Sequence, residues 1–164
     1  MDMPRDIVPN LWFDGNAEEA VAFYVSAFPD ARVLSEARYP EGSPGTPGSV
    51  MSIEFELLGR RYTAINGGPQ FSFTEAVSFG VLCEDQDEVD HFWSLLTEGG
   101  EEGRCGWLKD RFGLSWQVIP RGMEEVFGDP DPARAQRAVQ AMMGMRKLDV
   151  AALRAAADGE PAAR

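Results

Sequence analysis

An internal repeat constrains the fold of this chain more than any other feature. The segments FDGNAEEAVAFY and LCEDQDEVDHFW each place a capping residue before an acidic first turn and a pair of aromatic residues. The offset between them is constant at 69 residues, from Asn16 to Asp85 and from Phe23 to Phe92. Such self-similarity predicts two copies of one structural unit.

The repeat continues further along at a shorter offset. GRRYTAI (59–65) corresponds to GLSWQVI (113–119) at an offset of 54 residues, with a glycine, an aromatic and a branched apolar residue in the same order. Part of the difference lies in YPEGSPGTPGS (39–49), whose prolines and glycines predict a surface loop. Each half is therefore expected to contain a strand, a helix and three strands.

Apolar patterning places the elements. Helices are expected over 16–28 and 85–100, each opening on a capping box, Asn16 with Glu19 and Asp85 with Glu88. Strands are expected at 7–13, 31–39, 49–58, 61–66, 76–83 and 114–120. The fold class predicted is α+β, with two tandem βαβββ modules that form a curled mixed-sheet cup and C-terminal helices beyond them.

The domain organisation follows from the same pattern. We expect one domain over 1–128, with modules at about 5–70 and 74–121, and a C-terminal helical tail of two helices over 129–164. At 164 residues the chain is long enough for one well-buried core. No apolar run approaches twenty residues, and the start lacks a signal peptide, so a cytoplasmic location is expected.

The charge limits the partners. The net charge is −12, and residues 1–120 hold 20 acidic and 8 basic residues. An acidic body repels phosphate backbones and anionic lipids, so no nucleic acid and no membrane is expected, whereas a neutral or cationic small molecule fits better. Cys83 and Cys105 form no CxxC pair, which argues against a disulfide framework or a zinc–thiolate site.

Several motifs in order carry a resemblance to a known family. NLWFDGNAEEAVAFY, NGGPQF, EVDHFW and CGWLKDRFGLSWQVIP together resemble the PhnB-like branch of the vicinal-oxygen-chelate superfamily, which includes glyoxalase I, extradiol dioxygenases and bleomycin- and fosfomycin-resistance proteins. The likeness extends over about residues 5–157 and implies the glyoxalase/bleomycin-resistance fold. Members of this branch are often labelled methyltransferase-like. The glycines of NGGP indicate a turn between strands and not a nucleotide-binding turn, so methyl transfer is not expected.

The resemblance also implies where a metal would be bound. Superfamily enzymes hold a divalent metal through one residue on the first and last strand of each half. The equivalent residues here are Pro9, Thr63, Ser78 and Gln117, and only Gln117 has a credible metal oxygen. A register error of one residue, which would bring in Asn10 or Phe79, adds no imidazole or carboxylate. His91 lies within the second helix, so no metal site and no cofactor is predicted.

Candidate ligand-binding residues come from strand alternation and from the family positions. They are Asn10, Trp12, Thr63, Asn66, Ser78, Cys105, Trp107, Lys109 and Gln117. Trp107 and Lys109 share one face of a strand, and if Gln117 faces the cup, Trp116 packs beneath the helix. Two interpretations of Lys109–Arg111 stay open: polar contacts at the rim, or a turn through Asp110–Gly113 between the last two strands.

Three functions remain in competition. The favoured one is metal-independent binding of a small amphipathic molecule in an aromatic-lined cup. The second is a metal-dependent lyase, isomerase or dioxygenase with unusual ligands such as Gln117 with Glu54 or Glu56. The third is a regulatory or interaction domain whose tail binds a protein partner. Exposed strand edges and a Met-rich tail also predict a homodimer.

Overall fold

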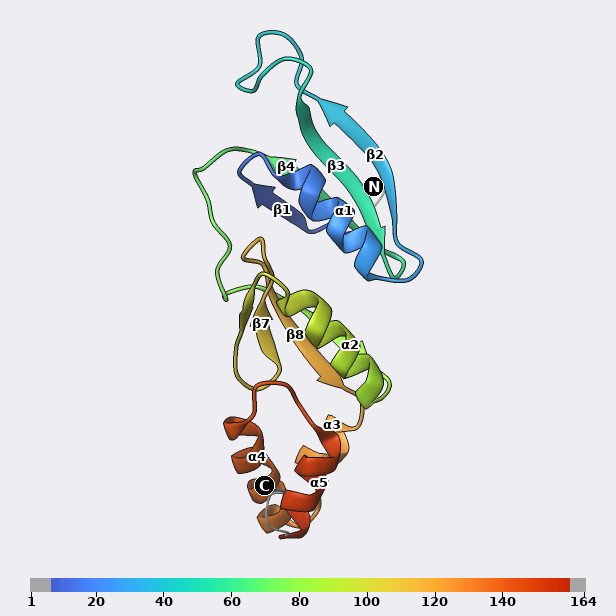
Figure 1. The fold of residues 1–164 in the computed structure, drawn as a ribbon, viewed down its shortest axis with the longest axis vertical. Helices are drawn as coiled ribbons and strands as arrows, with labels where there is room; N and C mark the ends of the chain where they lie inside the picture. The colour runs from blue at the N-terminus through green and yellow to red at the C-terminus, as the bar shows by residue number, and fades with distance from the viewer. Residues whose placement is uncertain (1–6, 160–164) are drawn as a thin grey trace, which may run out of the picture. The chain divides into compact units, whose positions relative to one another are not determined.

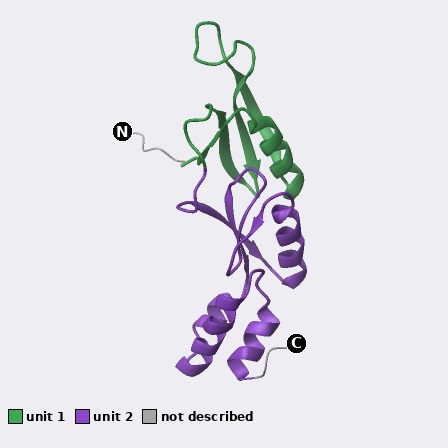
Figure 2. Cartoon of the chain, turned by 60° about the vertical axis from the view of Figure 1, so that its left-hand side comes forward, with its two compact units in different colours: residues 1–72 green, residues 73–164 purple. Residues whose placement is uncertain are grey.

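A computed structural model describes residues 7–159, so the outermost residues of the predicted ranges that begin at 1 or 5 or end at 164 lie outside the described part. The chain divides into two compact units, residues 1–72 and 73–164 (Figure 2). Each unit contains one four-stranded sheet and one helix that packs on it. The boundary lies between the two copies of the sequence repeat.

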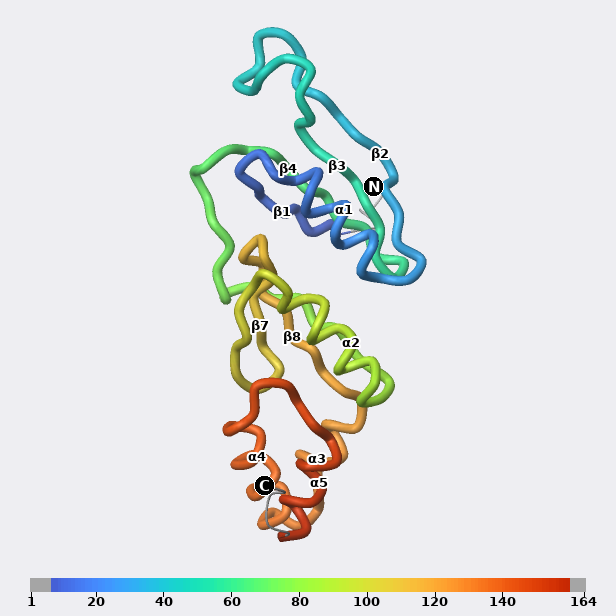
Figure 3. The backbone as a smooth tube through the Cα atoms, viewed as in Figure 1, coloured from blue at the N-terminus to red at the C-terminus, as the bar shows by residue number. Residues whose placement is uncertain are grey.

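The first unit is a βαβββ module. Its elements are β1 (Asn10–Phe13), α1 (Ala17–Ala27), β2 (Arg32–Arg38), β3 (Val50–Leu57) and β4 (Arg60–Asn66). The strand order is β1-β4-β3-β2, with β1 parallel to β4 and the other pairs antiparallel. Helix α1 lies across one face of this sheet (Figure 1). The predicted surface loop connects β2 and β3 (Figure 3).

The core of the first unit lies between α1 and the sheet. Leu11 and Phe13 of β1, Phe55 of β3 and Ala64 of β4 are buried, as alternation along the strands requires. The Tyr24 ring of α1 stacks on Phe55 with 6.3 Å between ring centroids. Because alternate residues face opposite ways, the other face of this sheet remains free of the helix.

The second unit repeats this topology and adds helices. Its elements are β5 (Ser78–Cys83), α2 (Gln86–Thr97), β6 (Glu101–Glu102), β7 (Trp107–Lys109), β8 (Ser115–Pro120), α3 (Met123–Phe127), α4 (Pro132–Gly144) and α5 (Val150–Asp158). The strand order β5-β8-β7-β6 matches that of the first sheet, with β5 parallel to β8. The predicted α+β class with two βαβββ modules and C-terminal helices is therefore confirmed.

The C-terminal helices have their own apolar cluster. It consists of Met123, Val126, Ala138, Leu148, Leu153 and Ala157. The stretch between α4 and α5 is also bonded to the sheet part of the same unit: Cys105 N–H donates to the Met145 carbonyl at 2.9 Å, and Gly106 N–H donates to that of Arg146 at 2.7 Å. The sequence predicted two helices here and missed the short α3. The division into a body and a tail stays a prediction.

The two capping boxes differ from the prediction. Asp85 accepts a hydrogen bond from the Glu88 N–H at 3.0 Å, as expected of an N-cap. Asn16 makes no such bond. The first N–H of α1, that of Ala17, instead donates to the Asn66 side chain at 2.9 Å, at the end of β4. The capping box predicted for the first helix is therefore wrong, because a residue distant in sequence supplies the cap.

The connection between the first strand and the helix is one residue longer in the first unit than in the second. Three residues, Asp14 to Asn16, connect β1 to α1, whereas two, Glu84 and Asp85, connect β5 to α2. The extra residue accommodates a left-handed Gly15 at φ +79°. Among the described residues, no helix is long and apolar enough to cross a bilayer.

Candidate functional site

The second sheet has one face covered by α2 and one face without it. Leu108, Trp116 and Val118 point to the helix and are buried, with Trp116 only 3% exposed. The neighbouring strand residues Trp107 and Gln117 are paired on the opposite face and are half-buried. The prediction that Trp116 lies in the core is therefore confirmed.

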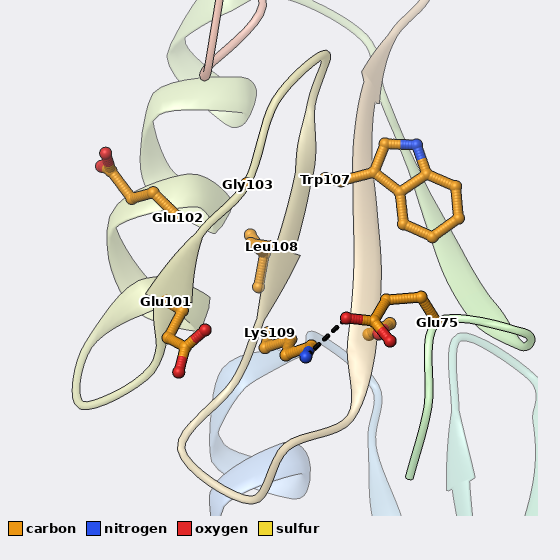
Figure 4. A pocket seen from close by; sticks show the side chains of 8 residues that line it. Glu75, Glu101, Glu102, Gly103, Trp107, Leu108 and Lys109 are labelled. Atoms are coloured by element: carbon orange, nitrogen blue, oxygen red, sulfur yellow. Dashed lines mark ion pairs between the residues drawn. The ribbon is translucent and has the colours of Figure 1, made fainter.

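A hollow of about 150 Å³ opens on this unit (Figure 4). Its lining consists of Glu75, Glu101, Glu102, Gly103, Trp107, Leu108, Lys109 and Ser115. The Trp107 indole and the Glu75 carboxylate extend to the same side of the strands (Figure 4). The structure thus brings the predicted residues Trp107 and Lys109 together with acidic side chains that the sequence analysis did not select.

An ion pair crosses the hollow. The Lys109 ammonium donates to a Glu75 carboxylate oxygen at 2.5 Å. The hydrogen bond from Lys109 lowers the pKa of Glu75, and the same bond raises the pKa of Lys109. Because the pKa of the carboxyl group falls and that of the ammonium group rises, both groups remain charged throughout the neutral range.

Ser115 contributes an unusual hydroxyl to this hollow. Its side chain is fully buried at 0% exposure, directly opposite Lys109 in the β7–β8 pairing. The Ser115 Oγ atom has no hydrogen-bond partner among the described residues. Buried hydroxyl groups are normally paired, so an orphaned one beside a hollow requires an explanation. The sequence could have predicted this position, because the residues on either side of the predicted Asp110–Gly113 turn pair with each other, which places Ser115 opposite Lys109.

The two residues of this unit that the sequence analysis predicted at metal positions form a hydrogen-bonded pair. The Gln117 amide nitrogen donates to the Ser78 hydroxyl at 2.9 Å, and both side chains are half-buried. A neutral amide and a neutral hydroxyl hold a dication poorly. No group of three His, Cys, Asp or Glu residues among those described is arranged to hold a metal ion. The donor set at these positions does not fit the divalent metal that the superfamily implies.

In the first unit the corresponding face carries three predicted residues. Asn10 pairs with Thr63 in the β1–β4 register, and Trp12 follows two residues along on the same face. Because Gly80 pairs with Gln117 in the second sheet, Asn10 corresponds to Gly80, so Pro9 corresponds to Phe79 and not to Ser78 as the sequence offset predicted. The Pro9 carbonyl accepts the Thr63 N–H at 3.0 Å. The register shift before α1 explains this correction.

Trp12 has a structural environment of its own. Its indole N–H donates to the Gly68 carbonyl at 2.8 Å, and its ring meets Phe71 edge-on at 5.1 Å between centroids. A Cβ atom at Gly67 would lie 2.1 Å from the same ring, so only glycine fits there. The Trp12 side chain therefore packs against the turn that follows β4.

Two predicted residues lie elsewhere. Asn66 lines a separate hollow of about 440 Å³ at the start of α1, where its carbonyl accepts from the Tyr39 hydroxyl at 2.6 Å. Cys105 does not line the hollow around Trp107. Its sulfur instead lies 3.8 Å from the Met143 sulfur, in contact with the C-terminal helices. Burial raises the pKa of the other cysteine, Cys83, to about 11, with smaller contributions from nearby carboxylates.

Asp110 is structural and does not form part of the rim. Its carboxylate accepts hydrogen bonds from the Phe112 N–H at 2.8 Å, the Leu114 N–H at 3.1 Å and the Trp116 indole at 2.9 Å. The side chain is 2% exposed. The turn interpretation therefore holds for Asp110, whereas Lys109 lines the hollow, so the two interpretations apply to different residues.

Comparison with known proteins identifies the family. A family model described as 3-demethylubiquinone-9 3-methyltransferase matches residues 5–119. The PhnB protein from Bacillus cereus is 34% identical, covers 71% of this chain and 99% of its own, and superposes with a TM-score of 0.65. No protein among those with curated functions matches.

More distant structures share the fold alone. A protein from Pseudomonas aeruginosa is 21% identical over 71% of this chain and 98% of its own, with a TM-score of 0.59. The fosfomycin resistance protein FosX from Listeria monocytogenes, solved with Mn(II) and sulfate, is 12% identical over 77% of this chain and 98% of its own, with a TM-score of 0.53. The fold is thus shared with these structures, and the chain belongs to the PhnB-like family, as its motifs predicted.

Proposed function

We propose that this protein binds a small amphipathic organic molecule at the hollow of its second unit, without a bound metal. The observation that carries this proposal is the hydrogen bond from Gln117 to Ser78, the two residues of this unit that the sequence analysis predicted at metal positions. An aromatic wall from Trp107 with a few polar groups beside it suits a small-molecule site.

The carboxylates named for a metal-dependent alternative are already engaged. Glu54 accepts from Arg61 at 3.3 Å and from the Ser35 hydroxyl at 3.1 Å, and Glu56 pairs with Arg32 at 2.9 Å. A metal would have to displace these partners before either carboxylate could coordinate it. This supports metal-independent binding over a lyase, isomerase or dioxygenase reaction.

Methyl transfer fits the chain poorly in spite of the name of the matched family. The glycine turn after β4 is covered by the Trp12 ring, whose indole donates to Gly68. A nucleotide-type cofactor needs such glycines open to approach the backbone. We therefore propose a binding function and no methyltransferase activity.

We also propose that the protein is a homodimer located in the cytoplasm. Strand β2 is an edge strand whose residues are all exposed, including Val33 at 52% and Leu34 at 37%. Unpaired edges of this kind are usually covered by another chain or protected by charge. Light scattering coupled to size exclusion measures the mass directly, and a monomer at micromolar concentration would contradict the dimer.

Metal analysis of protein purified without a tag or chelator tests the proposal. We expect well under one divalent ion per chain, and a thermal shift with at least one amphipathic compound that Trp107→Ala abolishes. Leu82→Ala, on the same sheet and 63% exposed, should leave that shift intact. About one metal ion per chain, lost in Gln117→Ala, would overturn the proposal in favour of a metal-dependent enzyme.

A further inference from the structure

We propose that the hollow around Trp107 selects a cationic ligand, an ammonium group joined to an apolar group. This inference rests on the proposed function and names the chemical class of the ligand. Three observations carry it: the charge of the lining, the orphaned Ser115 hydroxyl and the arrangement of the Lys109–Glu75 pair.

On the face of Trp107 the lining carries two carboxylates, Glu75 and Glu101, and one ammonium, Lys109, whereas the Glu102 carboxylate points away from Trp107 (Figure 4). Glu102 is engaged by the Trp93 indole at 2.9 Å and by Arg146 at 3.2 Å. Glu75 is engaged by Lys109. Glu101 lies opposite Lys109 in the β6–β7 pairing and, after Glu75, contributes to the raised pKa of Lys109, so two carboxylates share one ammonium and a net negative charge remains. A ligand cation supplies the missing charge, whereas a ligand anion meets repulsion.

The Ser115 hydroxyl adds a directional contact. Its oxygen is buried, lies in the lining and has no partner among the described residues. A hydroxyl oxygen accepts hydrogen bonds, and an alkylammonium group carries only donors. Because this oxygen is fully buried, a ligand ammonium reaches it only after a neighbouring side chain moves aside, and it would then satisfy an otherwise unpaired buried group.

Trp107 provides a surface for both parts of such a ligand. The face of an indole ring attracts cations and also packs against apolar groups. With a volume of about 150 Å³, the hollow has room for a small amine. An aromatic wall beside carboxylates is the usual chemistry of ammonium recognition.

The ion pair allows a test, because removing either of its two charges should change the affinity for a cation in opposite directions. Removing the Glu75 charge lowers the negative charge of the lining and frees Lys109, and both changes disfavour a cation. Removing the Lys109 charge frees Glu75, which favours a cation. If the pair served only to hold the strand in place, both changes would weaken binding alike.

The experiment uses benzylammonium, benzoate and benzyl alcohol as probes on the full chain, with binding followed by calorimetry or tryptophan fluorescence. We expect benzylammonium to bind at least about tenfold more tightly than benzoate, with benzyl alcohol between them. Glu75→Gln should weaken benzylammonium about fivefold and strengthen benzoate, and Lys109→Gln should strengthen benzylammonium about fivefold. Glu84→Gln removes a surface carboxylate paired with Arg121 and serves as the matched control without effect.

Ser115→Ala provides a second test. It removes an unpartnered buried hydroxyl, so the stability of the fold should hold or increase, while benzylammonium should bind several-fold more weakly. Benzoate binding as tightly as benzylammonium, or both charge variants weakening it, would overturn the cationic class. Failure of all three probes would also overturn it; the proposed binding function would then stand or fall on its own thermal-shift test.

Discussion

At the scale of the residue, the stretch from Cys105 to Pro120 divides into structural and candidate functional side chains. Trp107, Lys109 and Gln117 face away from the helix, as alternation along the strands predicted. Asp110 is buried within the turn, because its carboxylate satisfies three donors around it. Alternation predicts which face of the sheet a strand residue occupies. It does not predict which polar side chain of a turn is buried and accepts hydrogen bonds from the backbone.

Asp110→Ala should lower the free energy of unfolding by about 2–4 kcal/mol, because two backbone N–H groups and the Trp116 indole lose their buried acceptor. Urea denaturation followed by fluorescence measures the change. Arg111→Ala, which removes an exposed contact to Glu98, should change it by less than about 1 kcal/mol. Equal effects of the two substitutions would show that Asp110 has no special structural role.

At the scale of the element, the sequence located most helices and strands to within a few residues. Long periodic segments such as α1 and α2 have a strong signal. The two-residue β6 and the three-residue β7 are too short for any period to show, and they form because β7 pairs with β8 and β6 pairs with β7. The start of α1 depends on Asn66, 49 positions along the chain from Ala17. No local pattern could identify that cap.

The cap allows a direct comparison of two asparagines. Asn66→Ala should lower the free energy of unfolding by about 1–2 kcal/mol, because the Ala17 N–H loses its acceptor and the bond to the Val50 carbonyl is also lost. Asn16→Ala should stay within about 0.5 kcal/mol, since Asn16 makes no cap hydrogen bond. Chemical denaturation of both variants decides between the local cap predicted from sequence and the distant one. A larger loss for Asn16→Ala would contradict the structure.

At the scale of the whole molecule, the C-terminal helices are integrated into the second unit. Gln86 of α2 donates to the Leu148 carbonyl at 3.0 Å and accepts from the Val150 N–H at 3.3 Å. Leu148 is 2% exposed, and a Cβ at Gly106 would lie 2.9 Å from it. The loop before Trp107 is thus bonded and packed against the segment between α4 and α5. These contacts argue against a tail that is independent of the body.

Deletion of residues 129–164 should therefore lower the melting temperature of the second unit, because Met123 and Val126 lose the cluster that buries them. Leu148→Ala is a milder form of the same change and should cost about 2–4 kcal/mol. Met143→Ala, at a side chain 57% exposed, is the matched control with little effect. Differential scanning calorimetry measures all three. An unchanged melting temperature after the deletion would show that the tail is independent of the body.

The sequence by itself determined the family and the two βαβββ modules. These properties follow from local periodicity and from motifs whose residues are close in the chain. The tertiary structure decided the register of the first strand, the cap of α1, the burial of Asp110 and the grouping of Glu75, Glu101 and Ser115 around Trp107. Each of these depends on contacts between residues distant in sequence, which only strand pairing and side-chain packing bring together.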